Sequence, residues 1–344
     1  MFRRRRRTAM EWPELDRDPA YDDLAMRVAR GRLAQGDWGA ARDVLDATGG
    51  DTALRAARVR ELARLADDGR EPHAGRPAAA GGREPDAAQP AAIGDGREPD
   101  AAQPASAAGG WLRAWLDEAP EEPAAVLVDG AAKARRGEPD AEEVLRQAAA
   151  LAPRDPSPWV EVLWLLVGRG VQSDRRAFAA ALREVKQRDP HNHPAHRAAM
   201  AFAGSDRERF AVARLGAQTA PSGAAAGVLP VEAHVAFARR TIREPGGWDR
   251  RTLVALRRYF RRDEVHDEIV AGTERWRQGR GPRAVAPRHH EALAYFFADD
   301  RERLRMVIEE IHPYLGDGHP WNHFAEDGRG DILYVVARNT ALNG

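Results

Sequence analysis

Arg154-Asp155-Pro156 and Arg188-Asp189-Pro190 are the same tripeptide 34 residues apart, and Arg17-Asp18-Pro19 is a third copy nearer the start of the chain. A recurrence of this length is typical of two-helix repeat units. In each copy the aspartate can cap a helix and the proline can occupy its first turn. The spacing therefore predicts a chain built from helical hairpins, with its first helix over residues 19–34.

Apolar residues recur along much of the chain at helical spacing. Near the C-terminus they occupy positions i, i+3, i+4 and i+7, at Leu304, Val307, Ile308 and Ile311, which places them on one helix face. Apolar and polar residues alternate convincingly with period two nowhere in the sequence. The β-branched residues at the start of 332–342 nevertheless allow a strand there as well as a helix. We therefore expect an all-α fold, a solenoid of antiparallel helical hairpins.

Two resemblances extend this interpretation. Gly36-Asp37-Trp38-Gly39-Ala40-Ala41 is similar to the turn and small-residue position of a tetratricopeptide motif, and residues 18–66 and 109–196 resemble degenerate repeats of that family. Asp189-Pro190-His191-Asn192-His193-Pro194-Ala195-His196 resembles a segment of an uncharacterised bacterial family of unknown function, over most of residues 109–240. The first resemblance implies a helical-repeat fold, and the second carries no known activity.

Residues 67–110 differ in kind from the rest of the chain. The sequence GREPDAAQPA occurs at 82–91 and again at 96–105. Aromatic residues are missing from this segment and branched aliphatic residues are scarce, so it cannot bury enough apolar surface to offset its ordering entropy. We interpret it as a disordered low-complexity insertion. The chain is thereby divided into five parts. We expect a basic disordered tail over 1–17, N-terminal hairpins over 18–66, the insertion over 67–110, tetratricopeptide-like repeats over 111–242, and a C-terminal region that continues the array over 243–344.

Composition argues against several function classes. The 344 residues carry 53 basic and 53 acidic side chains, and a net charge of zero disfavours nucleic acid or an anionic membrane as the main partner. Cysteine is absent, which removes disulfides, thiolate metal sites and cysteine nucleophiles. The start of the chain carries arginines at 3–7 in place of the apolar core of a signal peptide. We therefore expect a cytoplasmic protein without a membrane span.

Three histidines within six residues, His191, His193 and His196, are the best candidates for chemistry. Imidazole is a common metal ligand, and three imidazoles could hold zinc with an open position. However, Pro194 restricts the residue before it to an extended or turn shape, and no carboxylate follows at metal-ligand spacing. We favour a structural role, in which His191 and Asn192 cap the next helix. A metal-dependent enzyme or metal-binding protein that uses the three histidines is the alternative.

Two further groups of histidines are weaker candidates. His289 and His290 lie at an expected helix start, where we expect them to be exposed. The stretch from His319 to His323 mixes an aromatic ring with polar groups in a turn that could anchor a peptide, although a packed loop is the favoured interpretation. The candidates for contact with a partner are therefore Asn192, Trp321, Asn322 and His323.

The segment 239–262 is rich in arginine and contains Trp248, Tyr259 and Phe260. Basic residues interleaved with aromatic ones can bind single-stranded nucleic acid. Four acidic residues between 263 and 268 follow directly and cancel much of this charge. We therefore interpret the segment as a solvated helix face and consider nucleic-acid binding the weaker hypothesis.

Familiar signatures of catalysis are missing from the sequence. Neither lysine precedes a serine or threonine, as the lysine of a phosphate-binding P-loop does, and neither a Gly-x-Ser-x-Gly nor a His-Glu-x-x-His motif occurs. We expect no cofactor. The combination of helical repeats and missing signatures predicts a non-catalytic protein-interaction module, an adaptor or scaffold, that binds a peptide or partner helix on the repeat surface.

Overall fold

The structure is a computed structural model that describes residues 14–68, 110–170, 174–243, 249–279, 284–316, 319–325 and 329–343. Within these ranges every regular element is a helix, and the sole strand-like feature is an isolated β-bridge. The all-α expectation is therefore confirmed. The helices of the first half are α1 Leu24–Leu33, α2 Gly39–Asp46, α3 Thr52–Asp68, α4 Gly110–Glu118, α5 Pro123–Arg136, α6 Ala141–Leu151, α7 Ser157–Gly168 and α8 Arg175–Arg188. Those of the second half are α9 His193–Phe202, α10 Asp206–Thr219, η1 Ala225–Val228, α11 Leu229–Ala238, η2 Arg239–Arg243, α12 Arg250–Phe260, α13 Asp263–Arg277, α14 Val285–Ala298, α15 Arg301–Ile311, η3 Pro320–Phe324 and α16 Gly330–Asn343.

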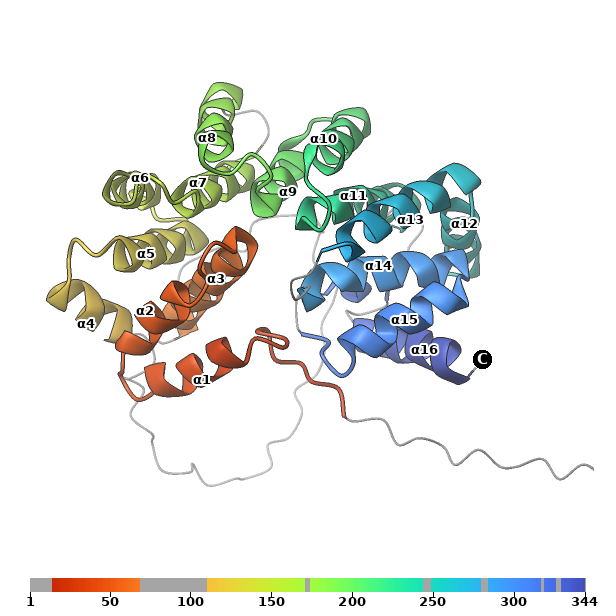
Figure 1. Cartoon of the computed structure of the whole chain (residues 1–344), viewed down its shortest axis with the longest axis horizontal. Coiled ribbons are helices and arrows are strands. Elements are labelled where there is room, and N and C mark those ends of the chain that lie inside the picture. Colours follow the sequence, from red (N-terminus) through yellow and green to blue (C-terminus); the bar gives the residue numbers. More distant parts are fainter. Residues whose placement is uncertain are drawn as a thin grey trace, which may run out of the picture.

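The helices from α5 to α11 are arranged in two rows. Each helix contacts its successor in the chain, and α5, α7, α9 and α11 also contact one another in that order. Figure 1 shows that α5, α7, α9 and α11 follow a curve, and that α6, α8 and α10 lie on the outer side of this curve. The apolar side chains that α5 to α9 bury belong mostly to one core that extends from Met26 to Phe202. A smaller, separate cluster that extends from Met200 to Ala233 lies between α9, α10 and α11.

Helix α3 lies against α5, α7 and α9, which are distant from it in the sequence. The side chain of Arg55 contacts Asp155 at 2.8 Å, and the Thr52 hydroxyl donates to the Asp189 carboxylate over 2.7 Å. Asp155 immediately precedes the N-cap of α7, and Asp189 lies in the turn before α9. The 34-residue recurrence thus separates two equivalent turns, and both aspartates hold the same helix.

The aspartate caps expected from the sequence are only partly present. Asp155 lies one residue before the α7 N-cap and accepts a hydrogen bond from the Ser157 backbone N–H over 2.8 Å. At α9 the cap is Asn192, whose side chain accepts from the Ala195 N–H over 2.9 Å, as one of the sequence interpretations anticipated. Asp189 is instead the C-cap of α8, so its expected role as a cap of α9 is wrong.

Two further helix boundaries depart from expectation. Helix α1 begins at Leu24 because the Asp23 side chain accepts from the Met26 N–H, and the residues before it form turns, so the expected helix over 19–34 starts too early. The C-terminal segment forms the helix α16, so the alternative of a strand at its β-branched start is wrong.

The C-terminal helices share a second core that is rich in aromatic side chains and extends from Val228 to Ala341. The rings of Phe260 and Phe297 stack with centroids 5.8 Å apart, and Phe324 packs on Phe297 at 5.5 Å. Helix α11 contacts both α9 and α14 and thereby joins this core to the two rows of helices. The C-terminal region therefore packs around a centre of its own.

The first described residues connect the N-terminal helices to the C-terminal region. We call residues 14–21 the terminal clasp. The Asp16 N–H donates to the Pro313 carbonyl over 3.0 Å, and the Leu315 N–H donates to the Asp16 carbonyl over 2.7 Å. Arg17 forms an ion pair with Asp331 of α16 at 2.5 Å. The N-terminal and C-terminal regions are therefore in direct contact (Figure 1).

Two sequence expectations fall partly outside the described residues. The basic tail was expected over 1–17, but Asp16 and Arg17 have defined partners and 1–13 lie outside the description. The insertion was expected over 67–110, but its first two residues complete α3 and its last residue begins α4. Residues 69–109, which include both copies of the duplicated sequence, lie outside the description.

Candidate functional site

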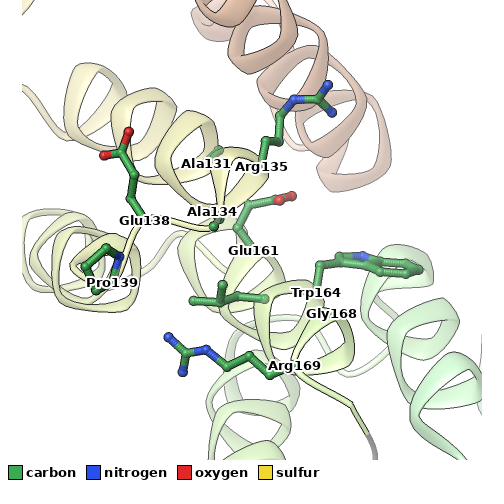
Figure 2. A pocket seen from close by; sticks show the side chains of 11 residues that line it. Ala131, Ala134, Arg135, Glu138, Pro139, Glu161, Trp164, Gly168 and Arg169 are labelled. Atoms are coloured by element: carbon green, nitrogen blue, oxygen red, sulfur yellow. The ribbon is translucent and has the colours of Figure 1, made fainter. Parts of the chain in front are cut away.

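A groove lies between the C-terminal parts of α5 and α7 and the turn that joins α5 to α6. It encloses about 440 Å³. Figure 2 shows the side chains that line it. Most of its lining is small or apolar, and four charged side chains complete it. The lining residues are Ala131, Ala134, Arg135, Gly137, Glu138, Pro139, Glu161, Trp164, Leu165, Gly168 and Arg169.

Two glycines shape the helices around this groove. Gly137 has a φ of +70°, in the left-handed region that glycine tolerates best, and it ends α5 by donating its N–H to the Ala134 carbonyl. Gly130 lies where α5 meets α6, and a Cβ on it would approach Leu145 Cδ2 to 2.8 Å. The missing side chain lets the two helices pack closely, and the sharp turn after α5 leaves the groove open beside them.

Basic side chains stand on both sides of the groove. Arg135 contacts Asp67 of α3 at 3.1 Å, and Arg169 contacts Glu142 of α6 at 2.6 Å. Hydrogen bonds from Arg146 and Arg169 lower the pKa of Glu142. The side chains of Arg135 and Arg169 remain 46 % and 41 % exposed. Figure 2 shows Arg135 beside α3 and Arg169 on the opposite side. Guanidinium groups carry five N–H donors, so both can also meet an incoming carboxylate or carbonyl.

Glu161 and Trp164 connect the groove to α3. The Glu161 carboxylate is 9 % exposed and lies 3.2 Å from Arg60 of α3. The Arg60 guanidinium also lies 5.0 Å from the centre of the Trp164 ring. The indole Nε1 of Trp164 is buried and has no hydrogen-bond partner among the described residues. The groove is therefore continuous with the face that already holds one helix.

The clustered histidines each have a separate setting. His193 Nε2 lies 3.2 Å from Glu232, His196 Nδ1 is 2.8 Å from the Asn192 carbonyl, and His191 is half-buried in the turn before α9. Burial lowers the pKa of His196. Within the ranges given above, no group of three or more His, Asp or Glu side chains is arranged to hold a metal ion. The metal hypothesis for this cluster therefore finds no supporting geometry.

A buried ionic group forms around Glu232 of α11, which the sequence analysis did not single out. Its carboxylate oxygens lie 3.2 Å from His193 and 3.0 Å from Arg197, both on α9. Burial raises the pKa of Glu232, but the charge of Arg197 and the contact with His193 outweigh it, so the pKa lies below its usual value. Burial also lowers the pKa of His290 on α14 to about 4, although Glu232 opposes that shift. This group joins α9 to α11 through contacts of buried charged side chains.

Two of the four predicted partner-binding residues are buried. Asn192 is 2 % exposed and its amide also donates to Asp189 at 3.1 Å. Trp321 is fully buried and donates its indole N–H to His289 Nδ1 over 3.1 Å. Their proposed contact with a partner is corrected accordingly, because both side chains are used inside the fold.

The other two partner candidates lie nearer the surface. Asn322 is half-buried, and its side-chain oxygen accepts from the Gly330 N–H over 3.1 Å. His323 is exposed and lies 3.5 Å from Arg239. His289, expected at the surface, is instead fully buried and bonded to the Tyr314 carbonyl at 3.0 Å. The turn is a packed element, and only His323 presents its ring to solvent.

Sequence reasoning did not find the residues of the groove. The run from Trp159 to Gly168 indicated a buried helix, and α7 confirms that. Glu161 was the signal that could have been used, because a carboxylate inside an apolar run needs a cationic partner from elsewhere. That partner, Arg60, lies about a hundred residues earlier in the chain, and sequence spacing does not reveal such a pairing.

Comparison of the chain with protein-family models, curated proteins and solved structures gives no match. In the part of the chain that the structure describes, no helix combines the length and apolar character needed to cross a membrane.

Proposed function

We propose that this protein is a non-catalytic interaction module, a tetratricopeptide-like solenoid, that binds a peptide segment of a partner protein in the groove between α5 and α7. The observation that carries the proposal is the groove itself, which encloses about 440 Å³ and has an apolar floor between two partly exposed arginines. Pockets with this combination hold ligand side chains by burial and orient them with a few polar groups.

The groove favours a peptide over a small substrate. Ala131 and Ala134 on α5 and Leu165 on α7 offer contact to an apolar side chain. Arg135 and Arg169 stand on opposite sides, where they can bond to backbone carbonyls or acidic side chains that flank it.

The arrangement of α3 supports the same proposal. The row formed by α5, α7 and α9 already binds a helix from a distant part of the sequence through Asp155, Glu161 and Asp189. This face is therefore suited to recognise another polypeptide, and α3 covers its central part. The groove is the part of the same face that remains open beside α3.

A groove-filling substitution tests the proposal. Gly168 lines the groove, and a Cβ at this position would meet no heavy atom within 4 Å, so Gly168→Trp can be accommodated while its indole fills the space. Gly31 on α1 is equally open and lies outside the groove, so Gly31→Trp is the matched control. Peptides selected from a random library on the whole protein should bind Gly168→Trp about tenfold more weakly, as measured by fluorescence anisotropy.

The control should bind these peptides as the unmodified protein does. Failure of the library to yield any binder would contradict the proposal. If every selected peptide bound Gly168→Trp with undiminished affinity, the proposal would be contradicted as well, since all of them would have to occupy another surface.

A further inference from the structure

Helix α12 separates its apolar and basic residues onto opposite faces. Leu256, Tyr259 and Phe260 are buried in the C-terminal core. The outward face of α12 and the two residues after it carry six exposed arginines. These are Arg250, Arg251, Arg257, Arg258, Arg261 and Arg262. Figure 1 places α12 at the far side of the molecule from α5 and α7, so this face is distinct from the groove.

The arginines at the C-terminal end of α12 are poorly neutralised. Arg261 pairs with Asp299 at 2.5 Å, and the Arg262 guanidinium lies over the ring of Tyr259 at 5.5 Å. Arg257 and Arg258 form no ion pair with any described residue. Arg257 and Arg258 lie four and three residues before Arg261, the αR C-cap of α12, and like charges at these spacings on a helix repel each other. A bound anion would relieve this repulsion.

The same four arginines surround a shallow hollow. It measures about 560 Å³ and is lined by Val254, Arg257, Arg258, Arg261 and Arg262 alone. Val254 is 58 % exposed and is the one apolar residue of this lining. The hollow thus offers one apolar contact inside a ring of guanidinium groups.

We propose that this α12 surface binds a short acidic peptide segment of a partner protein, one in which an apolar side chain is flanked by glutamates or aspartates. The charge complementarity is direct, because carboxylates match the geometry of guanidinium groups. Val254 supplies the contact for the apolar residue. The hollow is small, so the segment is only a few residues long.

Nucleic acid fits this surface less well. Tyr259 and Phe260 are 6 % and 0 % exposed, so neither ring is available to stack on a base. Asp263 and Glu264 are exposed and follow Arg262 directly, so a long polyanion that continued past the hollow would meet like charge. An exposed valine also contributes nothing to a contact with phosphates.

The test uses the whole protein and a fluorescein-labelled peptide of about five residues, in which one central leucine is flanked on each side by a pair of glutamates. Fluorescence anisotropy should show binding at about 20 mM salt that weakens by about 200 mM. Arg257→Gln with Arg258→Gln should weaken it about tenfold, and Val254→Ser should weaken it a few-fold. The matched control is Arg113→Gln with Arg305→Gln, which removes the same charge from two exposed arginines outside the hollow and should bind normally.

Three outcomes would overturn the proposal. The first is no binding at low salt. The second is equal weakening in the control, which would mean that net charge alone acts. The third is tighter binding of single-stranded DNA of about 20 nucleotides than of the peptide, which would assign the surface to nucleic acid. Gly168→Trp should leave this binding unchanged, so failure here is distinguishable from failure at the groove.

Discussion

At the scale of single residues, the repeated aspartates do more than the recurrence indicated. The sequence predicts their positions but assigns them to helix caps, a local role that can be read from neighbouring residues. In the structure Asp155 and Asp189 bind Arg55 and Thr52 of α3. Such pairings join residues a hundred or more positions apart, and no local pattern encodes them. The cap at α9 is Asn192, which was predictable because it precedes Pro194 at the expected helix start.

His289 makes the protein sensitive to acid. Burial holds the pKa of His289 at about 3, below its ordinary value of 6.5, so the unfolded chain takes up this proton first as pH falls. His289 therefore contributes stability that is fully present above about pH 6.5 and is lost as pH falls toward 3. Between about pH 7 and about pH 5, the free energy of unfolding should therefore fall by about 2 kcal/mol through this residue. Urea unfolding at about pH 7 and about pH 5 measures it.

His289→Gln is the matched variant, because an amide can still donate to the Tyr314 carbonyl and accept from Trp321 without titrating. Its stability should fall less between the two pH values. If the variant and the unmodified protein lose equal stability, the proton uptake belongs to other groups.

At the scale of elements, the helices with strong apolar periodicity were predictable from the sequence. Which helices pack against one another was not. The set from Leu304 to Ile311 forms the buried face of α15, as its spacing predicts. The groove was not predictable, because α5, α7 and the turn before α6 contribute to it separately and their approach depends on glycines. The position of α3 across three later helices is likewise a tertiary outcome. Local sequence determines such elements, and packing determines their neighbours.

Close packing of α5 on α6 makes Gly130 sensitive to substitution. In Gly130→Ala the added Cβ would approach Leu145 Cδ2 to 2.8 Å and the Leu145 backbone nitrogen to 3.2 Å. The free energy of unfolding should fall by about 1–3 kcal/mol. Gly31→Ala is the control, because its Cβ meets no atom within 4 Å, and it should raise stability by about 0.5–1 kcal/mol. Thermal unfolding measures the stability of both variants. If they are equally stable, α5 and α6 are packed less closely at Gly130 than these distances indicate.

At the scale of the whole molecule, the terminal clasp joins the start of the described chain to the C-terminal core. The contact is made by backbone hydrogen bonds between Asp16 and residues 313–316 and by the ion pair of Arg17 with Asp331. Nothing in the sequence near Asp16 indicates this, since a single bridge has no periodic pattern. The clasp joins the segment before α1 to the C-terminal core, in addition to the contacts of α11 with α9 and α14.

Hydrogen exchange tests the contact between the terminal clasp and the C-terminal region. The Leu315 N–H donates to the Asp16 carbonyl over 2.7 Å and should exchange slowly in the whole protein. In a variant that begins at residue 19, this amide should exchange at least about tenfold faster, while amides of α7 remain protected. Unchanged protection of Leu315 would show that the clasp does not hold the C-terminal region.

The most direct test of the interaction function is the NMR signal of the Trp164 indole. This N–H is buried at the edge of the groove and has no partner among the described residues. Titration of the whole protein with a peptide selected from the library should shift the Trp164 indole resonance and the Gly168 amide resonance together, in proportion to the fraction bound. Shifts confined to other helices, with both of these signals unchanged at saturation, would contradict binding in the groove between α5 and α7.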